Sequence, residues 1–135
     1  MIYISQVLTY TLYMRKTIQT SVVQEELMQL GHATNRELWI AVEKRIPGIT
    51  LTSIHRITQR LRKLETISCT PNLNGDGIID ANPLPHSHFM CRTCGNLTDI
   101  QLDKATVQSI QAQLHEGVVE DNMVIAGTCQ SCVYR

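Results

Sequence analysis

Apolar and polar positions alternate with the period of an α-helix over two segments in the first third of the chain. In residues 17–30 the apolar side chains recur every three or four positions, and Gly31 follows as a helix stop. Thr34 and Glu37, three residues apart, form a capping-box pattern at the start of a second segment, which ends at Pro47-Gly48. This spacing predicts two helices joined by a short connection.

A third helix is predicted over Leu51–Glu65, and its two faces differ in character. Its inward stripe is Ile54, Ile57, Thr58, Leu61 and Leu64. The opposite face carries Ser53, Arg56, Gln59, Arg60 and Lys63. Three short helices of which the last is basic on its outer face are typical of a DNA-binding helix-turn-helix. A small helical bundle with a solvated basic face has the same pattern and is the alternative at this point.

The period changes to that of β-strands beyond the third helix. The segment ISCTPNLNGDGIIDA predicts two short strands around an Asn-Gly-Asp-Gly turn, and a hairpin in this position is the wing of a winged helix. NPLP, residues 82–85, is the best candidate for a linker. Beyond it we expect strands at HFMC and LTDIQL, a helix over Asp103–Glu116 and a strand over Met123–Ala126.

These elements predict an α+β fold in two parts. The first, residues 1–81, is an N-terminal winged-helix DNA-binding domain, in which residues 1–13 form an arm of undecided structure. Residues 82–85 link it to a small α/β domain over residues 86–135, which is expected to bind metal and to dimerise. The second part is too short to be stable by core burial alone, which favours a zinc ion and a partner chain.

Charge is balanced over the whole chain, with 12 Lys/Arg and 12 Asp/Glu, but it is divided unevenly. Residues 1–66 carry nine basic and five acidic side chains, whereas residues 67–135 carry three and seven. The basic half suits a polyanion and the acidic half suits cations, with chance scatter of surface charge as the alternative. The apolar opening MIYISQVLTYTLY lacks a basic flank and is too short to span a bilayer, so we expect a cytoplasmic protein without a membrane partner.

Two cysteine pairs of the form CxxC, Cys91/Cys94 and Cys129/Cys132, can together make a tetrahedral zinc site. Four thiolates leave no open position on the ion, so such a site is structural. The alternatives are two disulfides or free thiols, which a cytoplasmic location disfavours, and a redox CxxC, for which a βαβ context is missing. Cys69 is left over in the predicted wing, as an inert thiol or, alternatively, a redox sensor.

A second candidate metal site is rich in nitrogen and oxygen donors. His86 and His88 lie two residues apart in a strand-like segment, so both side chains project from one face. Asp80, Asp99 and His32 are the further candidate ligands, and a mixed set of this kind suits Fe(II), Mn(II) or Zn(II). The two other histidines are not candidate ligands. His55 is expected to contact DNA or solvent, and His115 is expected to lie on the surface near a helix end.

A winged helix, an HxHF-x-C-x-x-C-G segment and a C-terminal CxxC together resemble the ferric uptake regulator family of metal-dependent repressors. The resemblance covers about Met14 to Arg135. It rests on HATNRELW as the opening of the second helix, PGITLTSIHRITQRL as the recognition helix and HSHFMCRTCGNLTDI as the metal-binding signature.

The resemblance implies two metal sites and one switch. The family's structural zinc ligands fall on Cys91, Cys94, Cys129 and Cys132, and its regulatory ligands on His32, Asp80, His86, His88 and Asp99. Regulatory metal, Fe(II) or Mn(II) with Zn(II) as a further option, would tie the winged helix to the dimerisation domain. Asp in place of Glu at position 99 resembles the peroxide-sensing branch, in which bound Fe(II) leads to histidine oxidation, here at His32 and His86.

The chain departs from the family pattern in three places. His55-Arg56 stands where a Tyr-Arg pair is usual, which puts the operator preference in doubt. Pro85 precedes the two histidines where some members have another histidine, so the accessory metal site is not expected. The first helix of longer members is truncated or replaced by Met1–Tyr13, and DNA affinity is expected to be lower for that reason.

The sequence therefore predicts a homodimeric repressor that binds double-stranded operator DNA when a regulatory metal is bound, with no small-molecule substrate. Ser53, Arg56, Gln59 and Arg60 are the candidate contacts in the major groove, and Arg15, Lys16 and Lys63 the candidate phosphate contacts. His55 is a further candidate DNA contact. One alternative is a constitutive DNA-binding protein with only a structural zinc, and another is a zinc-specific sensor. A metal-dependent hydrolase is disfavoured because HExxH, a nucleophile elbow and a phosphate loop are missing.

Overall fold

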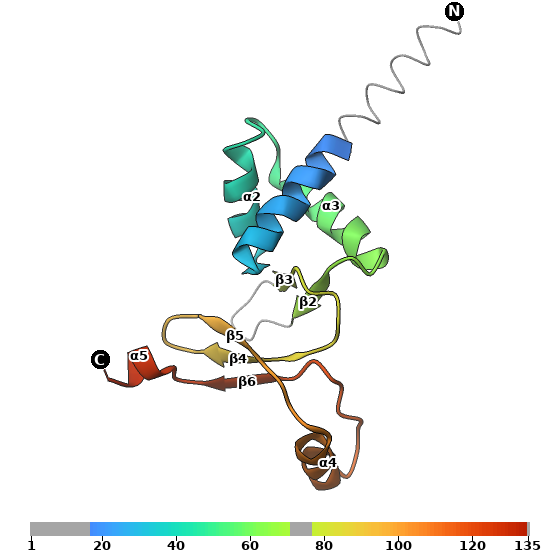
Figure 1. The fold of residues 1–135 in the computed structure, drawn as a ribbon, viewed down its shortest axis with the longest axis vertical. Helices are drawn as coiled ribbons and strands as arrows, with labels where there is room; N and C mark the ends of the chain where they lie inside the picture. The colour runs from blue at the N-terminus through green and yellow to red at the C-terminus, as the bar shows by residue number, and fades with distance from the viewer. Residues whose placement is uncertain (1–16, 71–76, 135) are drawn as a thin grey trace, which may run out of the picture. The chain divides into compact units, whose positions relative to one another are not determined.

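The structure, a computed structural model, describes residues 17–70 and 77–134 of the 135-residue chain. The chain divides into two compact units, with the boundary between Pro83 and Leu84 (Figure 1). This boundary lies inside the segment NPLP, the expected linker. Within the described ranges, no helix combines the length and apolar character needed to cross a membrane.

The described part of the first unit contains three helices, which lie over residues 17–30, Asn35–Glu43 (α2) and Leu51–Lys63 (α3). The capping box at the start of α2 is confirmed: the Glu37 backbone N–H donates to Thr34 Oγ1 at 3.2 Å, and the Thr34 N–H donates to Glu37 Oε2 at 2.8 Å. Thr50 caps α3 in the same way by accepting from the Ser53 N–H at 3.1 Å. Both helix starts are thus set by local hydrogen bonds that the sequence encodes.

The apolar faces of the three helices form the core of the first unit. Its fully buried members include Val23, Leu38 and Ile54. Four of the five residues in the predicted inward stripe of α3 are buried. The prediction is wrong for Leu64, which is 67% exposed. The reason is that α3 ends at Lys63 and the chain turns away at Glu65, which has a φ of 55°.

A three-stranded antiparallel sheet completes the first unit, in the order β1-β3-β2. The predicted hairpin is present as β2 (Ser68–Thr70) and β3 (Ile78–Asp80); most of its turn, residues 74–76, lies outside the described residues. The two-residue strand β1 (His32–Ala33) was not predicted. It pairs with β3, because the connection between the first two helices passes along that strand. Three helices and this hairpin form a winged helix.

Among its described residues, the second unit has a three-stranded sheet, in the order β5-β4-β6, and two helices (Figure 1). Strand β4 (Ser87–Cys91) is central, antiparallel to β5 (Leu97–Ile100) and parallel to β6 (Val124–Gly127). A parallel neighbour requires a long crossover, and α4 (Lys104–Gln113) lies within it. A short helix, α5 (Gln130–Val133), follows β6 and was not predicted.

Helix α4 is shorter than the predicted Asp103–Glu116. It begins after Asp103, whose Oδ1 accepts from the Thr106 N–H at 2.7 Å as an N-cap. Beyond its end the chain is held by Gln111, whose side chain donates to the Gly117 carbonyl at 3.0 Å and accepts from the Val119 N–H at 2.7 Å. Polar side-chain contacts of this kind compete with continuation of a helix.

The second unit buries few side chains. Only Ser87, His88, Met90 and Cys91 are buried among its described residues, and α4 contributes no buried residue. Leu114, Val118 and Ile125 are exposed apolar side chains. A unit of this size with so little core needs metal ligation or a partner chain for stability.

The capping box at α2 gives a direct test of the local energetics. Thr34→Ala removes the side chain that accepts from the Glu37 N–H, so we expect the free energy of unfolding to fall by about 1 kcal/mol. The measurement is chemical denaturation followed by helical circular dichroism. Thr52→Ala is the matched control, because Thr52 is exposed within α3 and caps no helix. An equal loss in both variants would contradict the capping role.

Candidate metal centres and DNA-binding face

The four CxxC cysteines converge at one end of the second sheet. Strands β4 and β6 are parallel and in register at Cys91 and Gly127, so the segments that follow them leave from the same end. Cys94 lies in the turn after β4, and Cys129 and Cys132 lie at α5. Their four Sγ atoms all lie within 4.8 Å of one another.

The spacing of these sulfurs suits zinc and not a disulfide. Cys94 Sγ and Cys129 Sγ are 3.8 Å apart, and all five cysteines of the chain are free thiols. Two thiolates bound to one tetrahedral zinc at about 2.3 Å lie roughly 3.8 Å apart. The predicted four-cysteine cluster is therefore assembled, in a geometry that fits a structural zinc.

The thiols of the cluster differ in acidity. The pKa of Cys91 is lowered to about 5, chiefly because the Cys129 backbone N–H donates to its sulfur, at 3.3 Å. The pKa of Cys132 is raised to about 12 by its hydrogen bond with the Cys129 side chain, by burial and by the other cysteines. Cys91 therefore offers a thiolate at neutral pH, while Cys132 holds a proton that a metal must displace.

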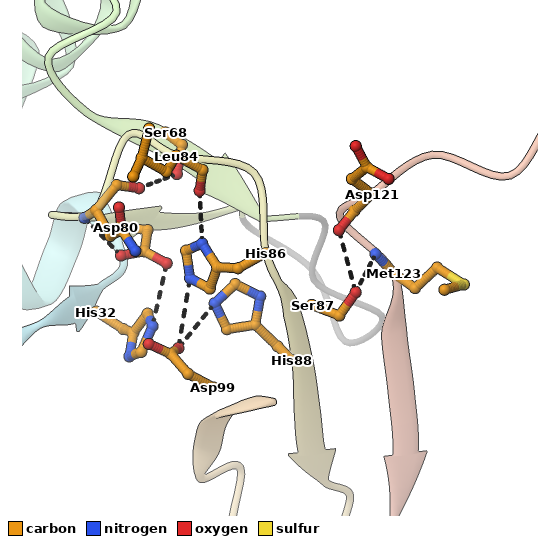
Figure 2. A network of polar contacts seen from close by, with 11 residues as sticks. His32, Ser68, Asp80, Leu84, His86, Ser87, His88, Asp99, Asp121 and Met123 are labelled. Atoms are coloured by element: carbon orange, nitrogen blue, oxygen red, sulfur yellow. Dashed lines mark hydrogen bonds and ion pairs between the residues drawn. The ribbon is translucent and has the colours of Figure 1, made fainter. Parts of the chain in front are cut away.

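A second cluster in the same unit is built on the pairing of β4 with β5 (Figure 2). His88 lies directly opposite Asp99 in the antiparallel ladder, and its Nε2 is 3.1 Å from Asp99 Oδ1. His86 Nε2 is 3.5 Å from the same oxygen, and the two imidazole centres are 4.4 Å apart. His86 precedes β4, yet its ring lies beside that of His88, as the sequence predicted for an HxH pair.

The tautomer of His86 is set by the backbone. Its Nδ1 lies 2.6 Å from the Leu84 carbonyl oxygen, which only accepts, so Nδ1 carries the proton (Figure 2). The lone pair is therefore on Nε2, the atom that faces Asp99. Histidines that bind metals are commonly oriented by a hydrogen bond of this kind from the other ring nitrogen.

The first unit contains a second cross-strand pair of the same type. His32 in β1 lies opposite Asp80 in β3, and its Nε2 is 3.2 Å from Asp80 Oδ2 (Figure 2). Asp80 is buried, and its other oxygen accepts from the Asn82 N–H at 2.8 Å. The sequence placed both residues among the candidate ligands, but only the unpredicted strand β1 makes them neighbours.

These donor sets fit a divalent ion of the first transition row. Nitrogen and oxygen ligands about 2.1 Å from one ion lie roughly 3.0–3.4 Å apart. The histidine–carboxylate separations of 3.1, 3.2 and 3.5 Å are close to that range. Imidazole and carboxylate donors without a thiolate suit iron, manganese or zinc.

The exposed face of α3 carries the predicted DNA contacts. Arg56, Gln59, Arg60 and Lys63 are exposed. Ser53 is half-buried, and its hydroxyl lies 3.0 Å from that of Thr50 at the cap of α3. Arg60 donates to Thr20 Oγ1 at 2.7 Å, which ties α3 to the first helix. Arg15 and Lys16 lie outside the described residues.

His55, His115 and Cys69 lie outside both candidate metal clusters. His55 is exposed on α3, and its Nδ1 is 3.1 Å from the Asn35 amide nitrogen, a partner that the sequence did not suggest. His115 is exposed, beyond the end of α4. Cys69 is half-buried in β2. The sequence did not single out Asn35 or Arg36, the first two residues of α2 after the Thr34 cap. Their only visible feature was that two polar residues stand at the start of a helix.

Substitution of one cluster cysteine tests the structural zinc. Cys94→Ser removes one of four ligands, so we expect bound zinc to fall from about one per chain to near zero. The thermal unfolding midpoint should fall as well, because ligation energy is folding energy. The measurement is elemental analysis of the purified chain. Cys69→Ser is the matched control and should keep its zinc, so zinc that survives in Cys94→Ser would refute the four-cysteine site.

Comparison with known proteins supplies the family. The sequence profile of the ferric uptake regulator family matches residues 12–125. The chain is 30% identical over 108 residues to the peroxide-responsive repressor PerR of Staphylococcus epidermidis, over 76% of this chain and 69% of that protein.

Solved structures give the same answer for the fold. The Campylobacter jejuni peroxide stress regulator is similar with a TM-score of 0.71 and 21% identity, over 94% of this chain and 98% of that chain. The Helicobacter pylori ferric uptake regulator Fur is similar with a TM-score of 0.70 and 18% identity, over 96% and 92%. The predicted α+β fold with an N-terminal winged helix is confirmed. The chain belongs to the ferric uptake regulator family of metal-responsive transcription regulators.

Proposed function

We propose that this protein is a homodimeric transcriptional repressor, not an enzyme, that binds operator DNA in the cytoplasm when a regulatory divalent metal is bound. The observation that carries this proposal is the pair of histidine–carboxylate sets, His32/Asp80 and His86/His88/Asp99, whose donors fit such an ion and are distinct from the four cysteines. Structural zinc holds the second unit together, and the regulatory ion acts as the switch.

The regulatory ligands are the five residues that the family resemblance implies, namely His32, Asp80, His86, His88 and Asp99. Two of them come from residues 1–81, the DNA-binding domain, and three from residues 86–135, the dimerisation domain. Ligands drawn from both domains would make the ion bind one relative arrangement of them more tightly than the others. Binding then shifts the population toward the arrangement that fits the operator.

Iron(II) or manganese(II) is the regulatory metal in this proposal, and zinc(II) is the alternative. The five ligands are all nitrogen or oxygen donors, which suit iron and manganese, while the thiolates of the cysteine cluster attract zinc. Peroxide is the further signal that we propose. It is supported by the similarity to a peroxide-responsive repressor and by Asp at position 99. His32 and His86 are then the positions of oxidation.

Dimerisation is assigned to the second unit. Leu114, Val118 and Ile125 expose apolar surface there, and α4 has no buried residue within the described chain. A second copy would cover apolar surface that one chain leaves in water, and association through matching surfaces favours two-fold symmetry. Two winged helices related by a two-fold axis suit a palindromic operator.

The DNA contacts are assigned to α3 and the segment before the first helix. Ser53, Arg56, Gln59 and Arg60 enter the major groove, with Arg56 as the main reader of base edges. Arg15, Lys16 and Lys63 contact phosphates, so affinity should fall with salt concentration. A hydrogen bond from Arg60 to Thr20 supports the orientation of this face, since it fixes α3 against the first helix.

The switch is tested with the double variant Asp80→Ala, His86→Ala, which removes one ligand from each domain. We expect the metal-dependent gain in operator affinity, typically about 5–150-fold for coupling of this size, to disappear. Fluorescence anisotropy with labelled operator, titrated separately with Mn(II), Fe(II) and Zn(II), measures it. The Cys69→Ser variant should respond as the unaltered protein does.

Two other outcomes of this titration would change the proposal. Undiminished metal-dependent binding in the double variant would refute the switch. If the unaltered protein binds operator equally with and without added metal and holds only about one zinc per chain, the constitutive alternative replaces it. A response to Zn(II) alone would assign the zinc sensor.

Peroxide sensing gives a separate prediction. After peroxide treatment, only the Fe(II)-loaded protein should release operator DNA, and the Mn(II)-loaded protein should stay bound, because manganese(II) does not support the same one-electron chemistry. Peptide mass spectrometry should find one added oxygen on His32 or His86. Release without modification of either histidine would assign the peroxide response elsewhere in the chain.

A further inference from the structure

A groove of about 290 Å³ lies within the first unit, along the side of α3 that faces the hairpin. The start of α2 forms one part of its wall through Asn35 and Arg36. Helix α3 contributes His55 and Arg62, and strand β2 contributes Cys69. Neither Arg36 nor Arg62 is among the DNA contacts predicted from the sequence.

The described lining of this groove is cationic. It contains two guanidinium groups and no carboxylate. Within residues 17–70 and 77–134, neither Arg36 nor Arg62 has an ion pair, whereas Arg45 is held by Glu25 at 2.7 Å and by Glu26 at 3.2 Å. The groove therefore concentrates positive charge that no ion pair among the described residues neutralises, which favours an anionic ligand.

His55 adds a donor of fixed direction to this wall. Thr58 is buried, and its hydroxyl lies 2.9 Å from Asn35 Oδ1 and 3.1 Å from the His55 carbonyl oxygen, so the Asn35 amide directs its oxygen toward Thr58. The Asn35 nitrogen, which can only donate, then lies 3.1 Å from His55 Nδ1. In the neutral ring Nδ1 must therefore be the acceptor and Nε2 must carry the proton. The ring presents an N–H on the side away from Asn35.

We propose that this groove is an anion site that holds a backbone phosphate of the operator. Arg36 and Arg62 are its charged donors, His55 Nε2–H is its neutral donor, and Asn35 is a positioning residue. The proposal rests on the proposed function, because it names how the same winged helix grips DNA. Phosphate contacts make up about half or more of the hydrogen bonds in protein–DNA complexes and set the orientation of the reading helix.

The two sides of α3 thereby have different tasks. His55 and Arg62 are seven residues apart and share one side of the helix, along the groove. Arg56 and Arg60 line a small cavity of about 100 Å³ on another side, together with Gln19 of the first helix. In this arrangement His55 positions the helix on the backbone, and base reading is left to Arg56.

Salt dependence of operator binding tests the groove. In the double variant Arg36→Ala, Arg62→Ala, the plot of log affinity against log salt should become less steep by about 0.9 for one lost phosphate contact. Affinity for operator and for unrelated DNA should fall by the same factor, so their ratio is kept. The matched control is a Lys44→Ala variant, which removes a charge at the opposite end of α2 and should leave the slope unchanged.

Arg56→Ala is the contrasting variant in the same assay. It should reduce the ratio of operator to unrelated DNA affinity, because it removes a base contact. An unchanged slope in the arginine double variant, or an equal change in Lys44→Ala, would overturn the groove as a phosphate site. Failure of every protein, including the unaltered one, to bind operator with any metal would instead count against the proposed function.

A second measurement needs no DNA and therefore separates the groove from the repressor function. Nitrogen-15 NMR of the zinc-loaded protein should show the Nε2–H tautomer of His55, and titration with inorganic phosphate should shift the His55 and Arg62 side-chain signals. Asn35→Asp, a near-isosteric change, should move the ring proton to Nδ1 and weaken DNA binding without lowering the unfolding midpoint. A proton on Nδ1 in the unaltered protein, or phosphate shifts confined to other residues, would refute the assignment.

Discussion

The pairing of short β-strands is the constraint on which both candidate metal sets depend. In each unit an antiparallel ladder places a histidine directly opposite an aspartate: His32 faces Asp80 between β1 and β3, and His88 faces Asp99 between β4 and β5. Cross-strand partners have Cβ atoms only about 5 Å apart, so the register alone brings imidazole and carboxylate within reach of one ion. A shift of one residue in either ladder would turn the donors to opposite faces.

The parallel pairing of β4 with β6 has a different consequence. It brings chain segments more than 30 residues apart to one end of the sheet, so Cys91 and Cys129 share a hydrogen bond and two CxxC turns become one cluster. The unit buries few apolar side chains among its described residues, and metal ligation can provide the stability that core packing does not. Zinc in this cluster and a switchable ion at His88 would then act on neighbouring residues of one strand, with separate tasks.

Much of the fold and many of the candidate ligands could be predicted from the sequence because they depend on local patterns. Helical periodicity located the first three helices, and the Thr34 capping box located the start of α2 to the residue. The two CxxC pairs and the HxH pair were recognisable because ligand spacing within a turn or a strand is a property of consecutive residues. The errors fall at element ends: Leu64 is exposed because the chain turns away at Glu65, and α4 is shorter because Gln111 side-chain contacts compete with helix continuation.

Tertiary structure alone decided which distant residues meet. Strand β1 is two residues long and has no pattern of its own, yet it makes His32 the neighbour of Asp80, nearly 50 residues away. The contact between Asn35 and His55 likewise joins two helices, and it is the basis for the proposed tautomer of His55. The sequence by itself determined the family and most of the elements, and it supplied the candidate ligands, since these follow from local spacing. Register, tautomer and the cationic groove arise only when segments far apart in the chain pack together.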